Sequence, residues 1–148
     1  ASGIPDGGAA LLVSRHRPPS ARGPVVRLAH WASVGVEPSR MGIGPVPAIR
    51  KLLEISRLTL EEIDLLEINE AFAAQVLACQ RELNIDPERL NPIGGAIALG
   101  HPIGCSGARI VVTLMHEMAR RKARYGIAAL CVSGGMGVAA LLESDTST

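Results

Sequence analysis

The sequence predicts an α/β domain whose mixed, five-stranded sheet carries helices on its faces and ends in an antiparallel strand pair. Two observations carry this prediction. Short apolar runs, typical of buried strands, alternate along the chain with amphipathic stretches of helical period. The last two apolar runs, residues 126–132 and 138–142, are separated by the glycine-rich stretch Ser133-Gly-Gly-Met-Gly, which indicates a hairpin.

The apolar runs expected to form strands are residues 9–13, 25–34, 65–68, 126–132 and 138–142. In the second run, strict alternation places Val26, Leu28 and His30 on one face. We therefore expect a structural role for His30.

Helical segments are expected at residues 47–55, 59–62, 69–83, 86–88 and 110–118. Pro47 suits the first turn of the first helix, and the spacing of Thr59 and Glu62 is that of a capping box. The basic residues after the last helix suit a solvated C-terminal helix end, and His116 suits packing or the surface.

Composition excludes several classes of function. With 15 basic and 14 acidic residues, the net charge of +1 predicts no nucleic-acid or anionic membrane partner. No apolar run approaches the roughly 20 residues that cross a bilayer. The three cysteines lack metal-ligand spacing, so we expect free thiols and no metal site. A cytoplasmic protein is expected, or an organellar matrix protein if a leader has been removed.

The most unusual stretch runs from Asn91 to Arg109 and places several glycines and His101 before an amphipathic helix. Gly100 and Pro102 flank His101, so the main chain largely sets the direction of its imidazole. A rigidly presented imidazole suits a general base. The alternative is a loop histidine that only hydrogen-bonds a carbonyl.

Two more polar groups stand at strand ends. Asn69 could cap the following helix, could orient a water or substrate, or could do both. Cys131, at the mouth of the hairpin, is either a small buried hydrophobe or a functional thiol beside backbone N–H groups that could surround an oxyanion. Together with His101, these groups permit acid-base chemistry on a carbonyl compound.

Three stretches, in order along the chain, carry a resemblance to a known family. They are Asn69-Glu-Ala-Phe-Ala, Gly100-His-Pro-Ile-Gly-Cys-Ser-Gly and Cys131-Val-Ser-Gly-Gly. The sequence resembles the C-terminal half of a thiolase of the acetyl-CoA acetyltransferase type. The resemblance implies a thiolase-like half-domain at residues 23–143, preceded at residues 1–22 by the last strand of the N-terminal domain and a connection, and followed at residues 144–148 by a polar tail.

The resemblance also implies residue roles. His101 would activate the nucleophilic cysteine, Cys131 would be the acid-base, and Asn69 would hold a water of the oxyanion hole. The N–H of Ser133 would serve a second oxyanion hole, where many relatives carry glycine; serine is tolerable there unless its φ is positive. The residues implied to line the pocket for CoA and the acyl group are Ser2, Met41 and Phe72.

The nucleophilic cysteine of the family lies in the N-terminal half, and neither Cys79 nor Cys105 matches its motif. We therefore expect acyl transfer between CoA thioesters, by thiolysis of a 3-ketoacyl-CoA or condensation of two acetyl-CoA, in a longer chain, with this segment alone inactive. CoA and acyl-CoA would be substrates, no cofactor would stay bound, and the complete protein would be a homo-oligomer, dimeric or tetrameric. The alternative is a non-catalytic CoA-binding or assembly module. A ketoacyl synthase fits the His101 and Cys131 motifs less well.

Overall fold

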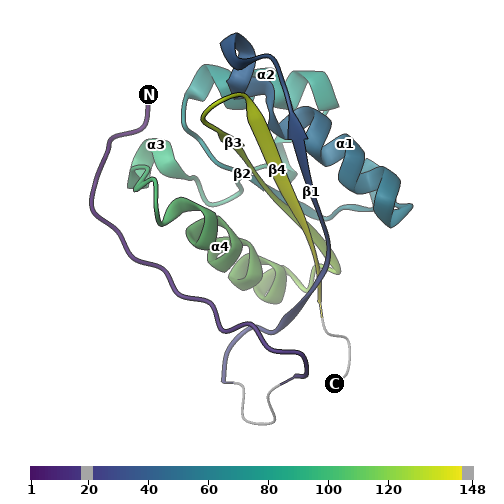
Figure 1. Cartoon of the computed structure of the whole chain (residues 1–148). Helices are drawn as coiled ribbons and strands as arrows, with labels where there is room; N and C mark the ends of the chain where they lie inside the picture. Colours follow the sequence, from purple (N-terminus) through teal and green to yellow (C-terminus); the bar gives the residue numbers. More distant parts are fainter. Residues whose placement is uncertain (18–21, 145–148) are drawn as a thin grey trace.

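The computed structural model describes residues 1–17 and 22–144 of the chain. Two layers of helices enclose one sheet, with α1 and α2 on one face and α4 on the other (Figure 1). The strands are β1 (Val26–Gly35), β2 (Leu65–Ile68), β3 (Tyr125–Val132) and β4 (Met136–Ser144). The helices are α1 (Pro45–Ser56), α2 (Ala73–Leu83), α3 (Ala96–Leu99) and α4 (Ser106–Arg121), with 3-10 turns η1 (Pro38–Ile43), η2 (Leu60–Glu62) and η3 (Pro87–Arg89).

The sheet is mixed, with strand order β1-β4-β3-β2. β4 runs antiparallel to β1 and β3, whereas β2 and β3 are parallel. The α/β class and the terminal hairpin are therefore confirmed. Because β1, β2 and β3 all point the same way, their carboxyl ends meet at one edge of the sheet, where the loops that follow them gather.

The expected fifth strand is wrong, since the described part of the chain forms four. Residues 9–13 adopt no strand, and Leu12 and Val13 are each 85% exposed. An apolar run becomes a strand only where a neighbouring backbone supplies ladder hydrogen bonds. Beyond β2 the sheet continues as one isolated parallel bridge between Leu66 and Leu90.

The expected alternation along β1 is also wrong. The pairing register with β4 shifts between Leu28 and His30, so the strand holds an extra residue there. After this bulge, Ala32 faces the core, while His30 and Trp31 are exposed. His30 is therefore a surface residue on an edge strand.

Two apolar cores hold the layers together. One packs α1 and α2 on the sheet through residues such as Ile49, Leu52 and Ile127. The other packs α4 on the opposite face through Ile110 and Leu114. The described residues include no helix long and apolar enough to cross a membrane.

Most helices lie where the sequence predicts them. The expected capping box is present, since the N–H of Thr59 donates to Glu62 Oε2 at 2.8 Å. One helix differs from the prediction. The helix expected from Asn69 instead begins at Ala73 with Phe72 as its N-cap. The capping role expected for Asn69 is therefore wrong, which leaves its side chain available to the neighbouring loop. Of the predicted connection and tail, residues 18–21 and 145–148 lie outside the described residues.

Candidate active site

His101 stands between two polar side chains. Its Nδ1 lies 2.5 Å from Ser106 Oγ, and its Nε2 lies 3.3 Å from Asn69 Nδ2. Ser106 uses its own proton in a 3.1 Å bond to the carbonyl oxygen of Pro102, so its Oγ accepts from Nδ1–H. The hydrogen-bond network thus assigns the proton to Nδ1 and leaves Nε2 as an unprotonated acceptor that faces Asn69. That is the tautomer a general base requires.

Asn69 is completely buried at the end of β2. Its N–H continues the ladder to β3 by donating to the carbonyl oxygen of Ala129 at 2.9 Å. Its Oδ1 has no hydrogen-bond partner among the described residues. A buried amide oxygen without a donor is uncommon, and it marks a place for a water or a substrate group.

Cys131 lies near the end of β3, next to the strand that leads to Asn69. Cys131 is 8% exposed, and burial raises the pKa of its thiol above the ordinary value. Cys131 is therefore a protonated thiol at neutral pH. Across residues 1–17 and 22–144, no hydrogen bond joins it to His101 or Asn69.

The other two cysteines lie elsewhere. Cys79 is buried in α2, where its Sγ donates to the carbonyl oxygen of Gly42 at 3.6 Å. Burial raises the pKa of Cys79 to about 11, so this thiol is not a thiolate at neutral pH. Cys105 is partly exposed just before α4.

The hairpin bend explains why serine is tolerated at position 133. The left-handed backbone conformations of the bend belong to Gly134 and Gly135, each with φ of 86°, while Ser133 is not left-handed. The link between β1 and η1 also holds the bend, because the N–H of Val36 donates to the carbonyl oxygen of Gly135 at 2.7 Å. Met41 is half-buried in η1, which packs on the hairpin and on α2.

The backbone of the hairpin comes closest to its neighbour where α1 begins. A Cβ built on Gly137 would lie 1.9 Å from the carbonyl oxygen of Gly44, and a Cβ on Gly44 would lie 2.5 Å from that of Met136. Only glycine allows two backbones to come this near. The bend that carries Cys131 and Ser133 is therefore fixed against the α1 side of the sheet.

The N-terminal segment connects the two remaining loops. Ser2 donates through its N–H and its Oγ to the carbonyl oxygen of Ala71, at 3.1 and 3.2 Å. The N–H of His101 donates to the carbonyl oxygen of Gly3 at 2.7 Å. Ser2, Asn69 and His101 are thus brought together, and Phe72 is half-exposed beside Ala71.

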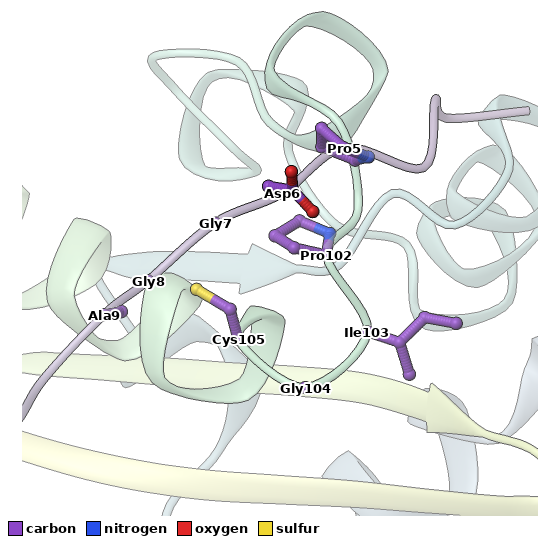
Figure 2. Close-up of a pocket in the computed structure, with 9 residues that line it drawn as sticks. All are labelled: Pro5, Asp6, Gly7, Gly8, Ala9, Pro102, Ile103, Gly104 and Cys105. Atoms are coloured by element: carbon purple, nitrogen blue, oxygen red, sulfur yellow. The ribbon is translucent and has the colours of Figure 1, made fainter.

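Two hollows lie along this segment. One of about 360 Å³ opens between residues 5–9 and 102–105; Figure 2 shows the N-terminal segment passing Pro102 and Cys105 there. Another, of about 1110 Å³, lies between residues 10–17, α4 and the start of β1. Neither is lined by His101, Asn69 or Cys131, so the hollows do not coincide with the polar cluster.

Sequence reasoning gave no role to three residues that support this cluster. Ser106 holds the imidazole, and Asn91 and Glu70 join the glycine-rich loop to the end of β2. Asn91 gave a weak signal as the polar residue between Leu90 and Pro92. Ser106 gave a better one, because an imidazole used at one nitrogen needs a partner at the other.

A buried ion pair was missed as well. Glu67 is 1% exposed on the α4 face of β2, and Arg109 donates to its Oε1 at 2.8 Å. Burial raises the pKa of Glu67 to about 7, although Arg109 opposes the rise. The signal was visible in the sequence, since Glu67 is a charged residue inside an apolar strand.

Comparison with known proteins identifies the scaffold. A family model for the C-terminal domain of thiolase matches residues 22–144. The chain is 54% identical to the acetyl-CoA acetyltransferase of Shinella zoogloeoides and 53% identical to that of Escherichia coli K12. Each match covers 97% of this chain and 37% of the relative, so the chain spans little more than a third of the length of these relatives.

Solved structures agree. The acetyl-CoA acetyltransferase of Bacillus anthracis superposes with a TM-score of 0.81 at 56% identity, over 82% of this chain and 31% of that one. Human mitochondrial 3-ketoacyl-CoA thiolase in complex with CoA gives a TM-score of 0.80 at 47% identity, over 82% and 31%. The chain therefore belongs to the thiolase family, of which it carries the C-terminal domain.

Proposed function

We propose that this chain is the catalytic C-terminal part of an acyltransferase that exchanges acyl groups between coenzyme A thioesters. The observation that carries the proposal is the unprotonated Nε2 of His101 beside the buried, partly unsatisfied amide of Asn69. The relatives named acetyl-CoA acetyltransferase, and a structural neighbour solved with CoA, support the substrate class.

In this proposal His101 is the base that prepares the nucleophile. Its Nε2 releases the hydrogen bond from Asn69 and takes the proton from a cysteine thiol supplied by a part of the protein outside this chain. In condensation the thiolate attacks the thioester carbon of acetyl-CoA, the C–S bond to CoA breaks, and CoA leaves with the proton of the imidazolium. In thiolysis the thiolate attacks the 3-keto carbon of the 3-ketoacyl-CoA and the adjoining C–C bond breaks, which leaves an acyl-enzyme for attack by free CoA. The negative charge that develops on the carbonyl oxygen needs hydrogen-bond donors. In one oxyanion hole the donors are the protonated imidazole of His101 and a water held at the unpartnered Oδ1 of Asn69. In the second oxyanion hole the donor is the N–H of Ser133.

Cys131 is the second acid-base group. In thiolysis its thiol gives a proton to the departing acetyl-CoA enolate; in condensation its thiolate takes the α-proton of acetyl-CoA. The raised pKa suits the first role, because the thiol begins protonated. Ser2, Met41 and Phe72 would line the pocket for CoA and the acyl chain.

The remaining assignments follow from the same proposal. Residues 23–143 would form the C-terminal catalytic domain, with residues 1–22 belonging to the end of the preceding one. CoA and acyl-CoA would be substrates rather than resident cofactors. The complete protein would be a cytoplasmic homo-oligomer, and this chain alone would be inactive because it lacks the nucleophile.

The intact mass of the purified chain, measured before and after exposure to acetoacetyl-CoA and beside a CoA-dependent thiolysis assay, tests the proposal. From the chain alone we expect neither an acetyl adduct nor turnover. From the complete protein we expect an acetyl adduct and turnover. A stable adduct on Cys79, Cys105 or Cys131 with turnover would show that the chain has its own nucleophile. Absence of both from a folded complete protein would reject acyl transfer.

A further inference from the structure

The side chain of Asn91 binds the last residue of β2 as a neighbouring strand would. Its Oδ1 accepts from the N–H of Ile68 at 2.8 Å, and its Nδ2 donates to the carbonyl oxygen of Ile68 at 2.9 Å. The N–H of Asn91 also donates to the carbonyl oxygen of Leu66 at 2.8 Å. Asn91 therefore completes the open edge of β2 directly before Asn69.

A second set of bonds ties down the other side of Asn69. Nδ2 of Asn91 also donates to Glu70 Oε1 at 3.2 Å, and Glu70 Oε2 accepts from the N–H of Ile97 at 2.9 Å. Both chain neighbours of Asn69, namely Ile68 and Glu70, are thus bonded to the loop that carries His101. The bonds made by Asn91 and Glu70, called the clamp below, therefore hold the segment that carries Asn69 against the loop that carries His101.

Asparagine suits this position for two separate reasons. Residue 91 has a left-handed backbone, with φ of 47°, which asparagine adopts more readily than most side chains. The position also needs a donor and an acceptor on one short planar group, which an amide provides. Aspartate would keep the acceptor but lose the donor, and it would place a charge beside Glu70.

The contact that the clamp controls has little tolerance. The distance from Asn69 Nδ2 to His101 Nε2 is 3.3 Å, near the upper limit for a hydrogen bond between nitrogens. A displacement of a few tenths of an ångström between the two loops would remove it. The alignment therefore depends on whatever fixes one loop against the other.

We propose that Asn91 is a positioning residue that holds the amide of Asn69 against Nε2 of His101. Asn91 acts through Ile68 and Glu70 and does not touch the reacting atoms. Its consequence for catalysis rests on the proposed function of His101, whereas the alignment itself is a property of this chain.

The test uses nitrogen NMR of the chain labelled with 15N at histidine, which reports the tautomer and the hydrogen bonding of each ring nitrogen. In Asn91→Gly the side chain is lost while glycine keeps the left-handed backbone. We expect the Nε2 resonance of His101 to move downfield, toward an imidazole nitrogen with no donor. Asn91→Asp keeps the bond to the N–H of Ile68 but loses the bonds to the carbonyl oxygen of Ile68 and to Glu70, and its charge repels Glu70. The Nε2 resonance should therefore move downfield in this variant as well.

Asn84→Gly is the matched control, because Asn84 is also left-handed, with φ of 54°, where α2 ends. An unchanged Nε2 resonance in folded Asn91→Gly overturns the proposal, as does an equal displacement in Asn84→Gly. If Asn91→Gly does not fold, the Nε2 resonance of His101 is measured in Asn91→Asp instead, and an unchanged resonance there overturns the proposal. The readout needs no turnover, so failure of the acyl-transfer proposal would leave this result intact.

In the complete protein, Asn91→Gly should lower kcat by about 10²-fold with little change in KM, because misplacement by about an ångström has that effect. Loss of turnover with an unmoved Nε2 resonance would assign Asn91 a different role and overturn the positioning proposal.

Discussion

Each end of α4 takes part in a pair of glutamate and arginine, yet the two pairs are built differently. At the N-terminal end, next to the His101 loop, Arg109 reaches into the interior to meet Glu67. At the C-terminal end, Glu117 accepts hydrogen bonds from Arg120 and Arg121, which extend into solvent; the Arg120 side chain is 61% exposed.

The electrostatic consequences are opposite. Burial dominates at Glu67 and raises its pKa to about 7, whereas the hydrogen bond from Arg120 dominates at Glu117 and lowers its pKa. A pair whose two partners are both buried loses more solvation than its mutual attraction returns. Glu117 is itself only 5% exposed, but both of its arginine partners reach solvent, so that pair keeps much of its solvation. The end of α4 beside the proposed site therefore carries its polar groups at a cost in stability, and the far end does not.

The largest expected effect separates two histidines, His101 in the loop before α4 and His116 within α4. In the complete protein, His101→Ala should lower thiolysis and condensation by about 10² to 10⁴-fold, the usual contribution of a general base. His116→Ala, on the exposed side of α4, should leave both rates close to those of the parent. Near-normal turnover of the His101 variant would remove this residue from the mechanism.

The next effect concerns Glu67 and pH. Its folded pKa of about 7 lies above the unfolded value of 4.5, so the folded state holds the proton more tightly between these values. The stabilising contribution is complete below about pH 4.5 and is lost as pH rises to about 7, by about 3 kcal/mol or less. Urea unfolding from pH 5 to 8 should show this decline in the parent and a flat profile in Glu67→Gln. Equal slopes in the two proteins would contradict the assignment, and Glu61→Gln serves as an exposed control.

Ser106→Ala tests the other partner of the imidazole. Removing the acceptor of Nδ1–H should destabilise the chain by about 1 to 2 kcal/mol and lower kcat of the complete protein by roughly tenfold. Thermal unfolding and steady-state kinetics measure the two effects, with the exposed Ser33→Ala as control. A variant with unchanged kcat would show that the Asn69 contact alone sets the imidazole.

The smallest effect belongs to the far end of α4. Glu117→Gln should lower the free energy of unfolding by about 1 kcal/mol or less at neutral pH. Because the folded pKa of Glu117 is lowered, its contribution is present above about pH 4.5 and is lost as pH falls through the folded value. Denaturant titrations at pH 7 and pH 4 check this, and a loss as large as that in Ser106→Ala would remove the contrast between the two ends.

Local patterns predicted the elements whose causes are local. The glycine bend after Val132 gave the hairpin, and the pairing of Thr59 with Glu62 gave the helical turn. Residues 9–13 and the bulge after Leu28 could not be predicted in this way, because both depend on a partner strand far away in the sequence.

The candidate site divides along the same line. The motifs around Asn69 and His101 pointed to these residues, and the structure places them in contact. Single residues near them gave a signal, but their partners could not be predicted, because the bonds from Asn91 to Ile68 and from Arg109 to Glu67 link positions 23 and 42 residues apart. Side-chain bonds of that range leave no periodic trace in a sequence.

The backbone contact between Gly44 and Gly137 limits how the protein can diverge. A single substitution at either position meets main-chain atoms rather than a side chain that could move aside. A second substitution at the partner position cannot compensate, since it would add atoms to the same gap. Descendants of this sequence can vary the loops on both sides of the contact, but the junction itself can change only if the whole hairpin shifts.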